Sequence, residues 1–342
     1  MHRHMAMQFL SDNAAAVHPA VWAAMQAADS ADAPYDNDGL SQAMDEAFAA
    51  LFGRDCAALW VASGTAANCL ALATMVEPHG GVICHAEAHI EMDEGGAPGF
   101  FLHGAKLMPI AGNHGKIAPS ALEVRLSSVR DGVHQVHPHA ISITQASEAG
   151  CVYRPEEIAA LARIAKAHSS AGRTLGLHMD GARFANAVAF LDCSPAQITV
   201  GIDALSFGFI KNGAMSAEAI VFFDAAVADL ARFRRKRAGH LQSKGRFLAA
   251  QILAMLKDDV WLENARAANA AAAELGAVAG DRLLYPVEAN EVFLACSSGE
   301  REALRRQGFG FYDWGDDAAR LVTAWNANGD HVSALARAIA AL

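Results

Sequence analysis

Two short segments of this chain combine residue types that could act together on one small molecule. In the first, Asp180 and Arg183 follow an apolar run at 174–179. In the second, Lys211 lies among glycine and small residues just past another apolar run, at 204–207. Apolar surroundings favour the neutral amine of a lysine, which makes it a nucleophile, and a buried carboxylate requires a charged or hydrogen-bonding partner.

Pyridoxal 5'-phosphate (PLP) requires these two kinds of side chain. Its aldehyde binds a lysine covalently, and its ring nitrogen stays protonated beside a carboxylate. The spacing therefore predicts Lys211 and Asp180 in these roles, with Arg183 near the same site. The alternative for Lys211 is an exposed loop lysine. The alternatives for Asp180 are a solvated turn residue and a local pair with Arg183. The apolar flanks and the glycines around Lys211 favour the cofactor site.

The segment 63–68 follows an apolar run at 57–62 and precedes a predicted helix. Unpaired backbone N–H groups at a helix start suit a phosphate, since Gly64 permits close approach and Thr65 offers a hydroxyl. Ordinary helix capping would explain this segment equally well by itself. Together with Asp180 and Lys211, it predicts the phosphate site.

A histidine-rich and acid-rich segment spans 85–96 and contains His89. Its spacing matches no zinc-binding template, so we interpret His89 as an aromatic side chain that lies over a flat cofactor. His134, His137 and His139 are interpreted as part of a loop before a strand at 140. A metal-dependent hydrolase built on these histidines is the alternative, and it predicts a bound metal and a colourless protein.

Short β-type runs alternate with helical segments, which favours an α/β fold with a largely parallel sheet. The predicted helices are 41–52, 63–76, one beginning at Pro155 and one from 247 onward; the predicted strands of the sheet are 57–62, 81–84, 140–144, 174–179 and 204–207, with 218–223 following the last in hairpin fashion. The last 60 or so residues are expected to run β-β-α-β-α, with strands at 291–296 and 320–325. We place a domain boundary within 248–261, which gives a large domain at 1–250 and a small domain at 251–342.

The composition of the chain argues against a nucleic-acid-binding, membrane-spanning or secreted protein. The 342 residues are 53% hydrophobic and carry a formal net charge of −10, and the basic run at 232–237 is short, so no nucleic-acid partner is expected. No apolar stretch is long enough to predict a membrane span. Six scattered cysteines without a CxxC pair indicate free thiols in a reducing compartment. Residues 1–7 contain no apolar core of secretory length, so a cytoplasmic protein is expected.

The segment 178–187, together with 206–208 and 211–215, resembles the low-specificity L-threonine aldolases. That resemblance implies the aspartate-aminotransferase-like fold, fold type I of the PLP enzymes, with a mostly parallel central sheet in a large domain and a smaller C-terminal α+β domain. It extends over roughly residues 9–342, and the further segments similar to family motifs are 9–13, 35–38, 63–68, 89–96 and 319–322.

The resemblance also implies roles for individual residues. Lys211 would hold the cofactor and Asp180 would face its ring nitrogen, with the remaining cofactor contacts made by Gly64, Thr65, His89 and Arg183. Arg320, Arg183 and Ser11 would bind the substrate carboxylate. Many family members have a histidine near the substrate hydroxyl where this chain has Glu148. The catalytic base is therefore His89, Glu148 or a bound water.

The implied reaction is PLP-dependent retro-aldol cleavage of L-threonine, L-allo-threonine and related β-hydroxy-α-amino acids to glycine and an aldehyde. A phenylserine-type aldolase or a β-eliminating lyase would use the same residues, and a catalytically silent relative is a further alternative. The family implies a homotetramer, a dimer of dimers with shared active sites. The basic run 234–237 resembles a segment lent to a neighbour's phosphate, and the alternative is a solvated helix face.

Overall fold

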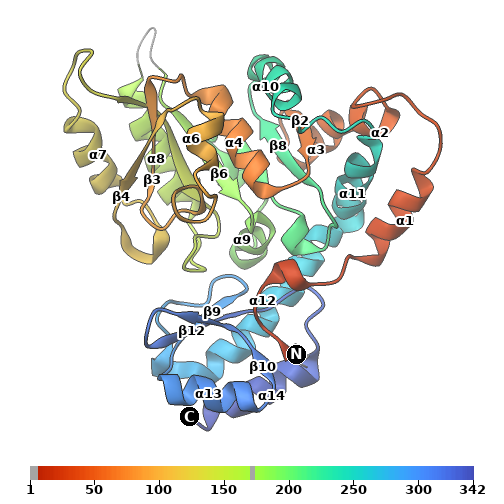
Figure 1. The fold of residues 1–342 in the computed structure, drawn as a ribbon, viewed down its shortest axis with the longest axis vertical. Coiled ribbons are helices and arrows are strands. Elements are labelled where there is room, and N and C mark those ends of the chain that lie inside the picture. Colours follow the sequence, from red (N-terminus) through yellow and green to blue (C-terminus); the bar gives the residue numbers. More distant parts are fainter. Residues whose placement is uncertain (1–6, 170–173) are drawn as a thin grey trace.

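The structure is a computed structural model that describes residues 7–169 and 174–342. Residues 1–6, at which the sequence lacks an apolar core of secretory length, lie outside this description. A seven-stranded sheet forms the centre of the larger part of the molecule (Figure 1), with the strand order β2-β8-β7-β6-β5-β3-β4. Its strands are β2 (Ala57–Val61), β3 (Gly80–His85), β4 (Lys106–Ile110), β5 (His137–Thr144), β6 (Gly176–Gly181), β7 (Ala204–Phe207) and β8 (Glu218–Phe222).

The sheet is mostly parallel, as the alternation of strands and helices predicts. β4, β3, β5, β6 and β7 pair in parallel, whereas β8 runs antiparallel to both β7 and β2. The antiparallel β7–β8 pair is the hairpin-like arrangement expected for 204–207 and 218–223. Because successive side chains of a strand point to opposite faces, a sheet covered on both sides contains strands that are apolar throughout.

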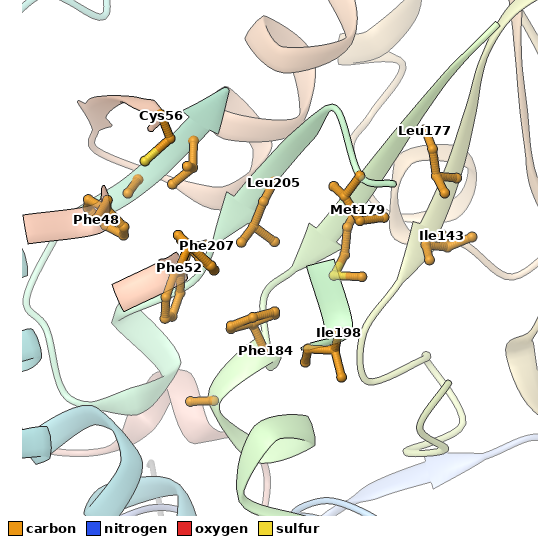
Figure 2. Packing of buried hydrophobic residues seen from close by; sticks show 14 of the residues in the cluster. Phe48, Phe52, Cys56, Ile143, Leu177, Met179, Phe184, Ile198, Leu205 and Phe207 are labelled. Carbon is orange, nitrogen blue, oxygen red and sulfur yellow. The ribbon is translucent and has the colours of Figure 1, made fainter. Parts of the chain in front are cut away.

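Packing on the two faces of the sheet follows this alternation. Leu205 and Phe207 of β7 belong to one hydrophobic cluster, whereas Ala204 belongs to another. The first cluster gathers the rings of Phe48, Phe52, Phe184 and Phe207 beside β6 and β7 (Figure 2). Phe184 and Phe207 are in direct contact, with ring centroids 4.8 Å apart. This core fixes the ends of β6 and β7, from which the predicted Asp180 and Lys211 extend.

The helices predicted at 41–52, at 63–76, from Pro155 and from 247 onward lie near observed helices. Residues 41–52 fold as two helices rather than one, and the second ends at Gly53, which has a φ of +63°. The helices are α1 (Pro19–Ala27), α2 (Gly39–Gln42), α3 (Met44–Phe52), α4 (Gly64–Met75), α5 (His89–Met92), α6 (Ala97–Phe101), α7 (Pro119–Ser127), α8 (Pro155–His168), α9 (Phe184–Leu191), α10 (Ala225–Arg237), α11 (Arg246–Leu256), α12 (Val260–Ala279), α13 (Ser298–Arg306) and α14 (Gly329–Ala340). Within the described residues, none of them is long and apolar enough to cross a membrane.

Two regions of the predicted strand pattern require correction. Strand β4 was not predicted, since it is a short run that contains Pro109 and is only partly buried. It forms an edge of the sheet, where a proline is tolerated. β5 begins at His137, so His137 and His139 lie in a strand and not in the loop expected before residue 140.

The C-terminal part has a different element order from the predicted β-β-α-β-α. It runs β9 (Glu291–Ala295), α13, β10 (Phe309–Gly310), β11 (Tyr312–Trp314), β12 (Ala318–Val322) and α14. Leu283, before β9, makes only an isolated bridge to Leu294, and β11 is short and largely exposed, so neither segment has a clear strand pattern in the sequence. β9, β11 and β12 form an antiparallel sheet in the order β11-β12-β9.

A second hydrophobic cluster lies under this smaller sheet. It includes residues of α12, such as Ala272 and Leu275, while Trp261 and Ala265 of the same helix belong to the large cluster. Phe9, from the N-terminal segment, also packs in the smaller cluster, next to the pairing of β1 (Met7–Gln8) with β10. The division into 1–250 and 251–342 remains a prediction, and α12 and the N-terminal segment join the two parts across it.

Candidate active site

One cavity of about 450 Å³ brings most of the predicted site residues together. It lies beside the ends of β5, β6 and β7, since Glu148, Arg183 and Lys211 each follow one of these strands. Ligand sites of open α/β sheets occupy this edge, outside the carboxyl ends of the strands. The lining residues are Ser11, Asn13, Glu87, His89, Met92, Asp93, Glu148, Arg183, Lys211, Trp314, Gly315 and Arg320.

Lys211 is held at the cavity by a tight turn, η4 (Ile210–Asn212), that follows β7. The carboxylate of Glu218 accepts hydrogen bonds from the backbone N–H groups of Phe209 and Ile210. Gly213 closes the turn with a φ of +120°, a conformation that favours glycine. Burial raises the pKa of Glu218 to about 8, although the two N–H groups and the charge of Lys211 lower it.

Asp180 lies at the end of β6, and only 4% of it is exposed. Its Oδ2 accepts a hydrogen bond of 2.8 Å from Asn68 Nδ2, and its Oδ1 accepts one of 3.0 Å from the N–H of Ala182. Its burial contradicts the alternative of a solvated turn residue. The ion pairs of the described residues join Arg183 to Asp12 and Glu291 and do not include Asp180, so the alternative of a pair with Arg183 is wrong as well. A buried carboxylate without a cationic partner fits a protonated ring nitrogen.

The N-terminus of α4 lies one helical turn from this carboxylate. Ser63 caps the helix by accepting a hydrogen bond from Ala66 N–H at 3.3 Å. In the described residues, the N–H groups of Gly64 and Thr65 have no hydrogen-bond acceptor, and a Cβ added at Gly64 would meet no atom within 4 Å. Neither residue lines the cavity itself. An open helix start with unpaired N–H groups fits a phosphate.

His89 begins α5 and is held by a buried carboxylate that the sequence analysis did not select. Its Nδ1 lies 3.0 Å from Oε1 of Glu94, whose side chain is fully buried. Asn68 Nδ2 donates to the same Glu94 oxygen at 3.0 Å. The hydrogen bond to Glu94 raises the pKa of His89, against the effect of burial. The density of acids at 85–96 was visible in the sequence, but nothing there indicated which of them meets the histidine.

The two arginines of the site are linked by carboxylates. Arg183 donates from Nε and Nη2 to the two oxygens of Asp12, at 2.9 and 3.1 Å, and its Nη1 lies 3.2 Å from Glu291 Oε2. Glu291 Oε1 accepts from Nε and Nη2 of Arg320, at 3.0 and 2.6 Å. Burial opposes the charge of Asp12, but Arg183 and Lys211 hold its pKa below the ordinary value.

Sequence reasoning missed Asp12 and Glu291, each of which is about 1% exposed. Glu291 is the first residue of the otherwise apolar strand β9, and a carboxylate in such a position is the signal that could have indicated it. Ser11, which was predicted to contact substrate, lines the cavity and accepts a hydrogen bond from Asn13 N–H at 3.2 Å.

Glu148 lines the same cavity, where the resemblance places a candidate base. Burial raises its pKa, Lys211 lowers it, and the charge of Glu291 raises it further, and the net shift is upward. This shift moves Glu148 toward the protonated form. A protonated carboxyl donates a proton more readily than it accepts one.

At least one residue of the basic run 234–237 makes its contacts within its own chain. Arg235 is buried, forms an ion pair with Asp36, donates to the carbonyl of Trp60 at 3.1 Å and lies over the Trp60 ring. Its guanidinium therefore fixes α10 against the sheet. In the described residues, no group of three His, Cys, Asp or Glu side chains is arranged to hold a metal ion.

These features define a class of enzyme. A lysine on a turn after β7, a buried aspartate at the end of β6 and an open helix start at the same edge of a mostly parallel sheet are the parts of a PLP site in a fold type I enzyme. Comparison with known proteins agrees with this class: the chain belongs to the beta-eliminating lyase family, whose model matches residues 8–297. The protein is therefore a PLP-dependent lyase.

Similar proteins extend over nearly the whole chain. A low-specificity L-threonine aldolase of Pseudomonas sp. (strain NCIMB 10558) is 42% identical, over 98% of this chain and 97% of the relative. One of Pseudomonas aeruginosa is 43% identical, over 97% and 96%. A solved structure of Leishmania major threonine aldolase superposes with a TM-score of 0.89 at 27% identity, covering 97% of this chain and 99% of that one.

Proposed function

We propose that this enzyme cleaves L-threonine, L-allo-threonine and related β-hydroxy-α-amino acids to glycine and an aldehyde. The observation that carries the proposal is that Lys211 and Arg320 line one cavity of about 450 Å³. A covalent anchor for the cofactor and a carboxylate-binding cation are thereby placed within reach of one amino acid. The relatives named low-specificity L-threonine aldolase support this substrate class.

The cofactor would be held by residues of the large sheet and of α4. Lys211 would bind it covalently, Asp180 would accept a hydrogen bond from its protonated ring nitrogen, and the N–H groups of Gly64 and Thr65 would bind its phosphate. His89 would lie over the ring, and Arg183 would reach its phenolic oxygen. When bound, PLP withdraws electrons from the Cα–Cβ bond that breaks.

The substrate would be held by residues of the small sheet and the N-terminal segment. Arg320 presents a planar fork that matches a carboxylate, and Ser11 lines the cavity nearby. Holding the carboxylate fixes which bond of Cα stands across the cofactor ring, which determines the bond that breaks. The proton of the β-hydroxyl passes to His89, to Glu148 or to a bound water.

An absorbance spectrum of the purified protein tests the cofactor and its anchor. We expect a band near the visible edge that shifts when glycine is added and changes character in Lys211→Ala, with Lys166→Ala as the matched control. Cleavage of threonine, followed by the aldehyde released, should fall at least about a thousandfold in Lys211→Ala. A protein that stays colourless after PLP is added would overturn the proposal.

We also propose a homotetramer with shared active sites, in the cytoplasm. Phe100 and Phe233 are large apolar side chains that are each 78% exposed, and contacts between chains would bury such side chains. The described cysteines are all free thiols, as expected in a reducing compartment. Sedimentation at several protein concentrations tests the assembly, and a monomer at micromolar concentration would contradict it. Fractionation of the source cells tests the location.

A further inference from the structure

Four side chains form a continuous hydrogen-bonded chain from His89, on the cavity wall, to the buried carboxylate of Asp180. His89 Nδ1 is 3.0 Å from Glu94 Oε1, Asn68 Nδ2 donates to that oxygen at 3.0 Å, and the same Nδ2 donates to Asp180 Oδ2 at 2.8 Å. Glu94 and Asn68 do not line the cavity, and both are buried. Their contacts therefore act on His89 and Asp180, not on a ligand directly.

We propose that Glu94 is a positioning residue that holds His89 in the tautomer with its proton on Nδ1, leaving Nε2 to accept a proton in the cavity. The inference rests on the proposed function, because it assigns His89 as the acceptor of the substrate's β-hydroxyl proton. In that step the O–H bond breaks and an N–H bond to Nε2 forms. The electron pair left on oxygen forms the carbonyl bond of the departing aldehyde as the Cα–Cβ bond breaks, and the pair of that bond stays with Cα, which takes up a proton to give glycine.

The tautomer follows from the chemistry of the partner. A carboxylate only accepts hydrogen bonds, so the nitrogen that faces Glu94 carries the hydrogen. In a neutral imidazole the other nitrogen is then an acceptor. Nε2 points away from Glu94, it has no hydrogen-bond partner among the described residues, and about a third of the His89 side chain is exposed. A free acceptor nitrogen thus lies on the wall of the cavity.

The position of Glu94 is itself fixed by three donors. Besides His89 and Asn68 on Oε1, the thiol of Cys69 lies 3.7 Å from Oε2. Asn68 and Cys69 are neighbours on α4, so the carboxylate rests against one rigid helix. Asn68 lies between two carboxylates and must present its NH₂ group to both, since its oxygen would be repelled. This arrangement resembles the acid that orients the histidine of a catalytic triad.

The charges around His89 define the expected pH behaviour. Glu94, Asp180 and Glu148 all face the imidazole and raise the pKa of His89, whereas burial lowers it. A base must be unprotonated, so activity should rise as the pH passes the pKa of His89. Removing the charge of Glu94 lowers that pKa, and the acid limb of the kcat/KM profile should move to lower pH.

The variant Glu94→Gln tests the proposal in the holoenzyme. Gln keeps the volume and an acceptor oxygen but loses the charge and the fixed tautomer. We expect kcat on threonine to fall ten- to a hundredfold, the usual effect of losing a partner that orients a histidine. KM should change little, and the acid limb should move down. Glu91→Gln, the same change at an exposed position three residues away, is the matched control.

A double-mutant cycle separates this role from a merely structural one. If Glu94 acts through His89, the effect of Glu94→Gln on kcat should largely disappear in a His89→Phe background, which keeps an aromatic ring but has no ring nitrogen. An undiminished effect in that background would overturn the proposal. So would a Glu94→Gln profile whose acid limb stays where it is in the unsubstituted enzyme.

A spectroscopic measurement remains decisive if the variant does not fold. In holoenzyme labelled with ¹⁵N-histidine, with the His89 signals assigned by their loss in His89→Phe, we expect the ring shifts of the Nδ1–H tautomer. The Nε2–H tautomer would overturn the proposal. This measurement needs no turnover, so an enzyme that leaves threonine intact would refute the proposed function and leave the tautomer to be judged separately.

Discussion

The side chains that line the two ends of the cavity, and the buried residues behind them, are held together by different kinds of interaction. At one, which we term the amide-linked end, Asp180, Asn68, Glu94 and His89 are joined by hydrogen bonds through a single neutral amide. At the other, the ion-pair end, the charges of Asp12, Arg183, Glu291 and Arg320 alternate. The first end lies wholly within residues 68–180 of the large sheet and its helices. The second joins the N-terminal segment, the large sheet and the small sheet.

This difference implies that the amide-linked end forms within the large part alone, whereas the ion-pair end must be assembled from several parts of the chain. The amide-linked end is supported by α4 and the large core alone, so it can be complete before the small sheet packs. The ion-pair end exists only when all three parts of the chain meet, because the buried charges of Asp12, Arg183 and Glu291 each come from a different part. The ring nitrogen of the cofactor would thus meet residues that are already in place. The substrate carboxylate would meet residues that come together only when the small sheet packs against the large part.

The largest expected effect concerns the amide-linked end. Asp180→Asn keeps the shape of the side chain but removes the charge opposite the ring nitrogen. We expect kcat/KM to fall by about 10²- to 10³-fold, or roughly 3–4 kcal/mol. The free energy of unfolding should fall by about 1–3 kcal/mol, because one of the two donors at the buried carboxylate loses its acceptor. Steady-state rates on threonine and urea unfolding of the same samples measure both. A loss smaller than tenfold would contradict the proposed role of Asp180.

Asp12→Asn should act mainly on stability. It leaves the buried guanidinium of Arg183 with Glu291 as its remaining charged partner, and breaking a buried pair in this way costs about 3 kcal/mol or more. The pKa of Asp12 is lowered in the folded protein, so its contribution is present above the ordinary value of 3.8 and is lost as the pH falls further. Urea unfolding at pH 7 and below pH 4 should show a difference that shrinks in acid.

Arg320→Lys tests whether the ion-pair end recognises a carboxylate by shape as well as by charge. Lysine keeps the charge but loses the fork that now spans Glu291 Oε1. We expect KM for threonine to rise about tenfold, with a smaller change in kcat. The absorbance of the bound cofactor should stay as it is. A change confined to kcat would place Arg320 at the reacting atoms instead of at the carboxylate.

The remaining expected effect is on stability and concerns Glu218, behind the Lys211 turn. Burial raises its pKa to about 8, above the ordinary value of 4.5, so the folded protein binds a proton that the unfolded chain releases between these pH values. Stability should therefore fall as the pH rises from about 4.5 to 8. Glu218→Gln, which still offers an oxygen to Phe209 and Ile210, should flatten this slope. Urea midpoints at pH 5 and pH 8 measure it, and an unchanged slope would contradict the assignment.

Local patterns in the sequence predict one part of the site and miss another. Lys211 and Asp180 were predictable because apolar runs and glycines surround them within a few positions. Asn68 and Asp180, however, lie 112 positions apart, and Asp12 and Arg183 lie 171 apart. A buried polar residue can be identified in a sequence only when its partner is known. A partner more than a hundred positions away produces no pattern in the neighbouring residues. Glu94 lies only five residues from His89, but the sequence does not show which of the acids at 85–96 meets the histidine. Glu291 was missed although it begins an apolar strand.

The same argument applies to the fold. The strands of the central sheet that are buried throughout, such as β7, appear as apolar runs and were predicted within a few residues. β4 and β11 are partly exposed, and their strand character depends on the neighbours with which they pair. In the C-terminal part, the predicted order is wrong because β10 and β11 were not predicted and the segment before β9 makes only an isolated bridge.

Helix α4 also fixes the distance between the predicted phosphate site and the amide that contacts Asp180. The unpaired N–H groups of Gly64 and Thr65 and the amide of Asn68 belong to one helical turn, which advances about 6 Å along its axis. This distance follows from peptide geometry, so it stays constant whichever side chains occupy the helix. Inserting one residue between Thr65 and Asn68 would rotate the amide by about 100° away from Asp180. The first turn of α4 thus fixes the distance between a bound anion and a ring nitrogen. This distance tolerates substitutions in the helix but not insertions.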